Sequence, residues 1–470
     1  MDKLSEIIKM IDDFVWGVPM MALILAGGLL LTVRMRFFQI RRLPLALKWM
    51  VKNEEGAEGD ISSFGALCLA LSATIGTGNI VGVATAITTG GPGALFWMIV
   101  AALFGMATKY AEGVLAVKYR VKTKDGSVLG GPFYYIERGM GERWKWLGKV
   151  FAVSGLLGGA FGIGTFTQIN GISTAVKGFF DPDTAYTVTL PFLGKYSITV
   201  VLTSVIVAVL TGIILIGGVK RIASVSEKIV PFMAIAYVAI TFVLVVCNIT
   251  KVPAALVYIV EAAFDPMAVT GGVVGSMLVA MQKGVARGIF SNEAGLGSAP
   301  IAAAAARTNE PVRQGLVSMT GTFIDTIVLC TMTGLAVVVT DAWRQTGLEG
   351  VDVTIYAFQH GLPTPAPVSS FLVMISLVAF AFTTIISWNY YAERCLTYLV
   401  GVRPKVTLAF KFVCVVAIFI GPYMTVSTVW MIADIFNGMM AVPNMIAIFA
   451  LNGVVVAETA GFFKLKKHLN

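Results

Sequence analysis

The stretch SSFGALCLALSATIGTGNIVGVATAITTGG, residues 62–91, decides the fold class of this chain. It is apolar, and it is longer than the roughly 20 residues that a helix needs to cross a lipid bilayer. The tetrapeptide GTGN, residues 76–79, falls near its middle, where two glycines and an asparagine disfavour an unbroken helix. We therefore predict a transmembrane helix that is interrupted halfway through the bilayer.

A second long apolar stretch, MAVTGGVVGSMLVAMQKGVARGIFSNEAGLGSAP at residues 267–300, is also interrupted by small and polar residues. Its break has two candidate positions, residues 271–276 and residues 281–284, and the sequence leaves both open. Hydropathy predicts eleven spans, of which the interrupted stretches are the second and the seventh. The spans lie near residues 15–34, 62–90, 93–118, 149–180, 197–217, 229–248, 268–306, 315–340, 368–398, 406–421 and 425–457.

The composition excludes a water-soluble fold. Of the 470 residues, 57% are hydrophobic and 13% are charged, which is about half of the ~25% charge of a soluble domain. The mean hydropathy is +0.83. We therefore predict an all-α polytopic membrane protein with about eleven transmembrane helices. One extra amino-terminal helix precedes two groups of five, each beginning with a broken helix, and this pattern is typical of an inverted five-plus-five repeat.

The expected domain boundaries follow from this repeat. Residues 1–61 hold the extra helix and an amphipathic helix at the cytoplasmic interface, residues 62–248 and 249–460 form the two five-helix repeats, and residues 461–470 form a cytoplasmic tail. An odd number of helices per repeat turns the two halves in opposite directions across the membrane. Both halves can therefore contribute to one site at the bilayer midplane.

Charge and chemistry-bearing residues narrow the function further. Lysine and arginine cluster in alternate connections, including residues 34–52, 118–149 and 464–467. The positive-inside rule makes these connections cytoplasmic, so we predict a multi-pass cell membrane protein with its amino terminus outside and its carboxyl terminus inside. The net charge of +9 thus reflects topology and not a nucleic-acid partner. Five cysteines and two histidines form no disulfide or metal pattern, and we expect neither a cofactor nor an enzyme activity.

Backbone groups freed at the first break suit a small dipolar ligand. N–H groups near Thr77, Gly78 and Asn79 form a positive helix end that favours a carboxylate. Carbonyl groups near Ser72 and Ile75 favour a cation. A zwitterion accompanied by a cation matches both ends, whereas the alternative is a packing kink in which the glycines serve only close helix contact.

Polar residues in two other spans are further ligand candidates. Thr165 and Gln168 lie in LLGGAFGIGTFTQINGIS, residues 156–173, and Gln168 either holds the substrate or bonds between helices. Thr383 and Thr384 offer hydroxyl groups to a sodium ion, although such pairs commonly bond to their own helix.

Two acidic residues lie deep within predicted spans. Asp434 occurs in WMIADIFNGMMAVPN, residues 430–444. Asp325 occurs in GTFIDTIVLCTMTG, residues 321–334. It either forms an ion pair, for which Lys109, Lys283 and Arg287 are the possible partners, or carries a coupling proton.

Four stretches carry a resemblance to a known family. They are GTGNIVGVATAITTGGPGALFWM at 76–98, LGGPFYYIERGM at 129–140, GGVKRIASVSEKIVPFMA at 217–234 and IFSNEAGLGSAP at 289–300. The chain resembles the alanine/glycine:cation symporters, the sodium:alanine symporter family, over nearly its whole length. The resemblance implies a LeuT-type fold and sodium-coupled uptake of alanine or glycine by alternating access. The alternative is a proton-coupled symporter of the same or another small amino acid.

The resemblance also implies roles for particular residues. The backbone around Thr77 and Gly78, with Asn79 nearby, would bind the carboxylate, and sodium, the coupling ion, would contact the Ser72 and Ile75 carbonyls and the Thr383 and Thr384 hydroxyls. The seventh span would contribute Ser276, Met277 and Met281 to the substrate pocket, with the methionines covering the substrate side chain. Asn292 and Glu293 would belong to a cytoplasmic gate. The expected partners are the substrate, sodium and the lipid bilayer. No obligate protein partner is expected.

Overall fold

The computed structural model describes residues 7–467 except 9, 12–14, 53, 55, 124–125, 192, 265–267, 271–272 and 276. Within these residues the chain is mostly helical, and its strands form three two-stranded antiparallel ladders. The all-α prediction is therefore confirmed.

Eight helical stretches among the described residues are long and apolar enough to cross a membrane. The number becomes nine when the bent pair Ser63–Thr74 and Gly78–Gly90 is taken as one span. The count of eleven stays a prediction, because the other two expected spans form shorter helices: α2 has 17 residues and α14 has 16.

The first half of the chain contains the first broken helix, formed by α5, η1 and α6. In chain order its elements are α2 Val18–Arg34, α3 Phe38–Arg41, α4 Leu43–Met50, α5 Ser63–Thr74, η1 Gly78–Gly82, α6 Val83–Gly90, α7 Gly93–Lys118, β1 Val121–Lys122, β2 Val128–Leu129, α8 Pro132–Tyr135, η2 Ile136–Met140, η3 Glu142–Trp144, α9 Lys145–Phe161, α10 Phe166–Phe180, β3 Thr187–Leu190, β4 Gly194–Ser197, α11 Ile198–Ile216 and α12 Gly218–Cys247.

The second half contains the second broken helix, formed by α14 and α15. Its elements are α13 Val252–Phe264, β5 Ala268–Thr270, β6 Val273–Gly275, α14 Met277–Asn292, α15 Ala299–Ala304, α16 Pro311–Thr322, η4 Phe323–Cys330, α17 Thr331–Val339, η5 Ala342–Arg344, α18 Val351–Gly361, α19 Ala366–Val400, α20 Pro404–Ile420, η6 Gly421–Tyr423 and α21 Val426–Lys467.

Helix α7 lies against elements of both halves and positions the second broken helix. It packs most extensively on α14 and α16, while α9 packs on α19 and α21. The approach to α16 is close, because a Cβ atom at Gly113 would lie 2.9 Å from the Cα atom of Gly315. Small residues that allow such contacts are the usual basis of helix packing in membranes.

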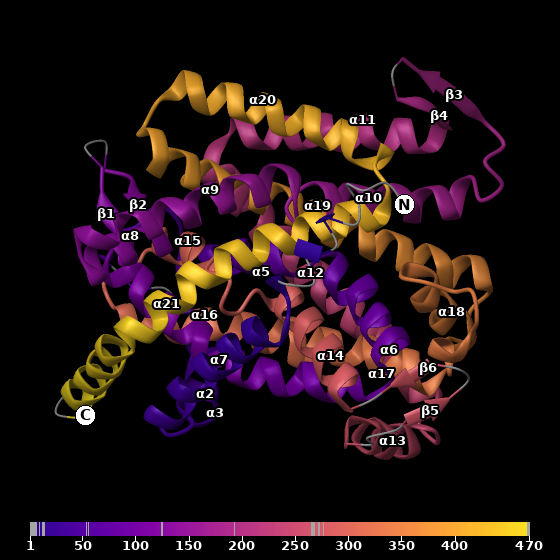
Figure 1. Ribbon diagram of the computed structural model, residues 1–470, viewed down its shortest axis with the longest axis horizontal. Helices are drawn as coiled ribbons and strands as arrows, with labels where there is room; N and C mark the ends of the chain where they lie inside the picture. Colours follow the sequence, from indigo (N-terminus) through magenta and orange to yellow (C-terminus); the bar gives the residue numbers. More distant parts are fainter. Residues whose placement is uncertain are drawn as a thin grey trace.

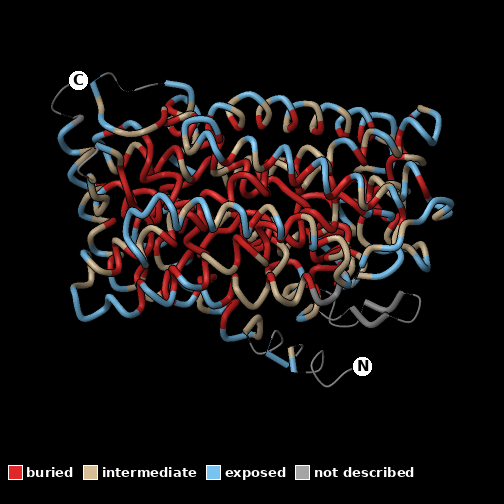
Figure 2. Tube along the Cα trace, turned by 90° about the horizontal axis from the view of Figure 1, so that it is seen from above, coloured by how far each residue is buried: buried red, intermediate tan, exposed pale blue. Residues whose placement is uncertain are grey.

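The outer helices face away from this interior. Figure 1 shows α11 and α20 packed side by side along one edge of the molecule. Apolar side chains such as Leu202, Ile206 and Val209 of α11 are exposed there, as expected for a surface that contacts lipid. Buried residues instead fill the middle of the bundle (Figure 2). Residues at both breaks, such as Gly78 and Ser291, are among the buried ones.

Candidate functional site

The first broken helix is interrupted at the predicted place. Helix α5 ends at Thr74, η1 begins at Gly78, and the two segments are bent by 53°. Ile75 between them has an extended backbone, with φ −75° and ψ 93°. The prediction of a break in this span is confirmed.

The N–H groups at this break are bonded to two side-chain amides. Asn79 Oδ1 accepts a hydrogen bond from the Gly76 N–H at 2.9 Å, and Gln168 Oε1 accepts one from the Thr77 N–H at 3.2 Å. The Gln168 amide nitrogen donates to the Ile163 carbonyl at 3.0 Å. Two neutral oxygens therefore occupy the positions in which the oxygens of a carboxylate could accept the same bonds.

Gly76 lies where no side chain fits. A Cβ atom built on it would lie 2.7 Å from Thr384 Oγ1 and 3.0 Å from Gln168 Oε1. The absence of a side chain at Gly76 thus lets the backbone of the break approach both the α19 hydroxyl and the α10 amide.

The second broken helix is interrupted later than predicted. Helix α14 continues through residues 281–284, so that candidate break is wrong, and the candidate at 271–276 lies partly outside the described residues. The chain leaves the helix at Glu293, which has φ 55°, and Gly295 and Gly297 follow with φ 91° and 82°. Glycine adopts this left-handed backbone without steric cost, and α15 then begins at Ala299.

The two breaks meet at a shared carboxylate. A Cβ atom at Gly78 would lie 3.2 Å from the Cα atom of Ser291, near the end of α14. Asp325 on η4 accepts hydrogen bonds from the Asn79 amide at 2.7 Å, the Ser291 hydroxyl at 2.8 Å and the Thr326 hydroxyl at 2.7 Å. Asp325 therefore connects both broken helices through neutral donors.

Oxygen atoms of α19 and of residues 72–75 form a cluster next to the first break. Thr384 Oγ1 lies 3.2 Å from the Ile75 carbonyl oxygen, and the Ser72 hydroxyl donates to the Thr383 carbonyl at 2.8 Å. The Ser387 hydroxyl donates to the Ser72 hydroxyl at 2.6 Å. All these side chains are buried and uncharged, and a hard cation such as sodium prefers ligands of this kind.

The cluster differs from the predicted one in three members. Ser72 contributes its hydroxyl, whereas its carbonyl was predicted. The Thr383 hydroxyl donates to the Phe380 carbonyl of its own helix at 2.9 Å, so Thr383 contributes its carbonyl and not its hydroxyl. Ser387 was not predicted, although it lies one helical turn after the two threonines and therefore on the same face of α19.

Other predicted site residues lie elsewhere. The Thr165 hydroxyl donates to the Gly159 carbonyl at 2.6 Å in the bend between α9 and α10. Met277 begins α14, and Met281 lies one turn on, about 15 Å along the helix from Ser291. The structure does not bring these methionines to Thr77, and Ser276 lies outside the described residues.

Asn292 and Glu293 lie at the second break itself. The Asn292 amide donates to the Thr326 hydroxyl at 3.0 Å, and its oxygen accepts from the Ala294 N–H at 2.9 Å. Glu293 accepts from the Trp388 indole at 2.8 Å and from the Ser298 hydroxyl. These contacts fix the geometry of the break, and a gating role for either residue stays a prediction.

A cavity of about 950 Å³ leads to the first break from one face of the molecule. Its wall includes Thr77 and Asn170 at one part, and Gly90 and residues of the segment 343–352 at another. Arg287 also lines it, pairing with Asp434 at 3.5 Å and lying over the Trp430 ring at 4.8 Å. Arg287 thus has an acidic partner other than Asp325.

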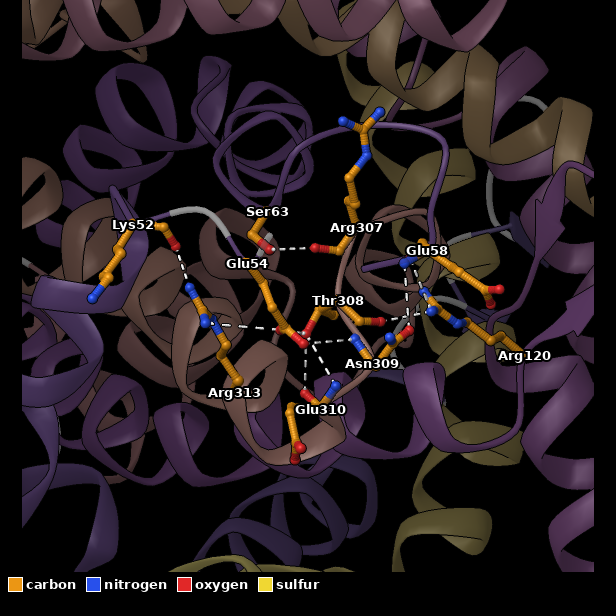
Figure 3. A network of polar contacts seen from close by, with 10 residues as sticks. All are labelled: Lys52, Glu54, Glu58, Ser63, Arg120, Arg307, Thr308, Asn309, Glu310 and Arg313. Atoms are coloured by element: carbon orange, nitrogen blue, oxygen red, sulfur yellow. Dashed lines mark hydrogen bonds and ion pairs between the residues drawn. The ribbon is translucent and has the colours of Figure 1, made fainter. Parts of the chain in front are cut away.

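The opposite ends of the broken helices are joined by a polar network (Figure 3). Arg120, just after α7, donates to the carbonyl groups of Ala304 at 3.1 Å, Ala306 at 2.8 Å, Glu58 at 3.1 Å and Thr308 at 2.6 Å. The segment before α5 and the segment after α15 are therefore held together at this face.

The family model of the sodium:alanine symporter family matches residues 1–470. The chain belongs to this family. A protein of Haemophilus influenzae named "Uncharacterized transporter" is 52% identical to this chain. The match covers 99% of this chain and 97% of that protein. The sodium/alanine symporter AgcS of Methanococcus maripaludis is 44% identical over 98% of each chain.

A solved structure gives the fold of this symporter family member. The crystal structure of MhsT in complex with L-phenylalanine has a TM-score of 0.51 and 16% identity, and it covers 84% of this chain and 100% of that chain. The LeuT-type fold is therefore confirmed. The protein is a multi-pass membrane transporter of the amino-acid symporter class and not an enzyme.

Proposed function

We propose that this protein takes up alanine or glycine together with sodium by alternating access. The observation that carries the proposal is the pairing of two features at one break. Backbone donors that suit a carboxylate, at Gly76 and Thr77, lie next to a neutral oxygen cluster that suits a monovalent cation. A zwitterionic amino acid and one sodium ion match this pair of features.

The substrate carboxylate would displace the two amides. Hydrogen bonds from N–H groups to an ionised acceptor are roughly twice as strong as those to a neutral one, so a carboxylate competes well against the oxygens of Asn79 and Gln168. The displaced Gln168 amide then becomes available to the substrate. In this mechanism, the N–H groups of Gly76 and Thr77 bind the carboxylate, and Gly78, Asn79 and Gln168 are the other substrate-binding residues.

Sodium would bind where α5 meets α19. The oxygens of Ile75, Thr384 and Ser72 lie within hydrogen-bond distance of one another or of their α19 neighbours, so small rotations direct them at one ion. Because the ion links α5 to α19 beside the substrate donors, each ligand should tighten the binding of the other. Such coupling is what symport requires.

The orientation of the protein in the membrane is inferred from the charge distribution of its connections, which places the amino terminus outside. The 950 Å³ cavity then faces outward, and the Arg120 network lies on the cytoplasmic face. Sodium entering down about 100 mV contributes ~2.3 kcal/mol, and a tenfold gradient adds ~1.4 kcal/mol. Together these support roughly 500-fold accumulation of a neutral zwitterion.

Uptake into proteoliposomes tests the proposal. Labelled alanine is supplied with an inward sodium gradient, with potassium, or with a proton gradient alone, and is competed by glycine, serine and both alanine enantiomers. We expect saturable uptake that requires sodium and is competed by glycine. Uptake that is equal in potassium would overturn sodium coupling.

Proton coupling is the second candidate function. It is favoured by one observation, the buried carboxylate of Asp325 in contact with both broken helices. If Asp325 carries the coupling proton, Asp325→Asn abolishes the dependence of uptake on a pH gradient and leaves substrate binding intact. Unchanged dependence on the pH gradient in this variant removes the candidate.

A further inference from the structure

Helix α7 places a lysine inside the bundle without a close partner. Lys109 is 3% exposed, and its Nζ atom has no hydrogen-bond partner within the part of the chain that the structure describes. An ammonium group inside a membrane protein is strongly disfavoured unless opposite charges stabilise it. The surroundings of Lys109 must therefore supply negative charge.

Two buried glutamates provide negative charge beside the second break. Glu112 follows Lys109 by three residues, so both side chains lie on the same face of α7. Glu112 Oε1 accepts hydrogen bonds from the Gly295 N–H at 3.1 Å and the Asn444 amide at 2.7 Å. Its Oε2 atom has no hydrogen-bond partner among the described residues.

Glu293 adds a second carboxylate at an unfavourable position. It directly follows the last residue of α14, where the helix end already carries partial negative charge. Like Glu112, it is fully buried. A carboxylate at the carboxyl end of a helix is disfavoured, and a cation near the second break would stabilise it.

Lys109 lies beside the second break through its place on α7. It precedes Glu112 by one turn on the same face of the helix, and Glu112 bonds to the Gly295 N–H group of the break. Of the two basic residues of α14, Arg287 is already paired with Asp434, and Lys283 is exposed. The negative charge at the second break is therefore offset from α7.

We propose that Lys109 is the resident cation of the second break and takes the place of a second coupling ion. Its ammonium group carries three donors and no acceptor, and the unbonded Oε2 atom of Glu112 lies one turn along the same helix face. Because it is tethered to α7, it cannot be released to the cytoplasm in each cycle. Sodium is then required at the first break only, and one sodium ion moves with each amino acid.

This inference rests on the proposed sodium coupling, and its experiment has two independent readouts. The first is the charge moved per alanine, measured from the reversal potential of proteoliposomes. The second is the melting temperature of the purified protein, which does not depend on transport. The variants are Lys109→Met, Lys109→Met with Glu112→Gln, and Lys118→Met. Lys118 is a matched control on the same helix, because it has an acidic partner, Glu458 at 2.5 Å, and its side chain is 32% exposed.

We expect one charge per alanine in the wild type. Lys109→Met should reduce uptake about tenfold or more at the sodium concentration that half-saturates the wild type, because it leaves a buried carboxylate without its counter-charge. It should also lower the melting temperature. The double variant should bring uptake back to within about threefold of the wild type and should restore the melting temperature. Lys118→Met should change neither quantity.

Three outcomes would overturn the inference. They are two charges per alanine in the wild type, wild-type behaviour of Lys109→Met, and a double variant that is no better than the single one. If the wild type shows no sodium-dependent uptake, the proposed function fails, and the melting temperatures of the single and double variants still decide whether Lys109 neutralises Glu112.

Discussion

The two broken helices differ in what satisfies the broken backbone. At the first break the exposed donors bond to neutral amides, and the neighbouring cluster consists of hydroxyl and carbonyl oxygens. At the second break the buried groups include the ionisable side chains of Glu293, Glu112 and Lys109. One break therefore offers weakly held positions to ligands, and the other contains ionisable side chains of its own.

This difference separates the roles of the two halves. A site that exchanges ligands in every cycle benefits from neutral partners, because neutral amides are easily displaced by charged ligands. A site that only needs to keep its shape benefits from permanent charges held by hydrogen bonds. We infer that the first break carries the transported ions and that the second break maintains the geometry that Asp325 shares between them.

The largest effect is expected from Gly76→Ala at the first break. The new Cβ atom would lie 2.7 Å from Thr384 Oγ1 and 3.0 Å from Gln168 Oε1, so it disturbs the cation cluster and the amide together. We expect sodium-dependent uptake to fall about 100-fold or more, in keeping with two displaced ligand groups. The measurement is the initial rate of alanine uptake in proteoliposomes.

Gly82→Ala is the matched control for that change. It lies in the same span, and the nearest atom to its Cβ would be the Thr77 carbonyl oxygen at 4.0 Å. Near-normal uptake in Gly82→Ala and in Gly76→Ala alike would show that the first break tolerates a side chain, which contradicts its assignment as the ligand site.

The next effect distinguishes the two threonines of α19. The hydroxyl groups of both threonines bond to the Phe380 carbonyl of their own helix, but only that of Thr384 also lies within hydrogen-bond distance of the Ile75 carbonyl, at 3.2 Å. Thr384→Val should raise the sodium concentration for half-maximal uptake about tenfold to 100-fold, because a bond to a charged ligand contributes about 1.5–3 kcal/mol. Thr383→Val should leave it within about threefold, since its carbonyl is retained. Equal effects in a sodium titration would contradict this assignment.

The first break could be predicted because its signal is local. Glycines and an asparagine in the centre of an apolar run disfavour a helix whatever surrounds them, and Gln168 is conspicuous as an amide in an apolar span. The pairing of the two amides with the Gly76 and Thr77 N–H groups could not be predicted, because it depends on the distance between α10 and the break.

The second break was misplaced because its signals are ambiguous. Gly295, Gly297 and Pro300 are equally typical of a loop at the end of a span, and only the start of α14 shows that they lie inside one. Ser387 was missed for a related reason. Its role arises from a hydrogen bond to Ser72, which lies 315 residues earlier in the chain. A single sequence does not reveal that contact.

The smallest effect is expected where an ion pair is exposed, at Lys122 and Glu58. Their side chains are 57% and 56% exposed, in contrast to the 3% of Lys109. The hydrogen bond and charge of Lys122 lower the pKa of Glu58, so any stabilisation is present above the ordinary pKa of a glutamate and is lost as the pH falls through the lowered value. Solvent and salt screen this pair on both sides.

Lys122→Met should therefore leave alanine uptake unchanged and shift the melting temperature by less than about 2 °C, and high salt should remove even that shift. The same lysine-to-methionine change is then costly at residue 109 and nearly neutral at residue 122, because burial and not the number of charges decides how much a cation contributes. If Lys122→Met matched Lys109→Met in both readouts, the second break would have no special need of a cation, and the contrast between the two breaks would be lost.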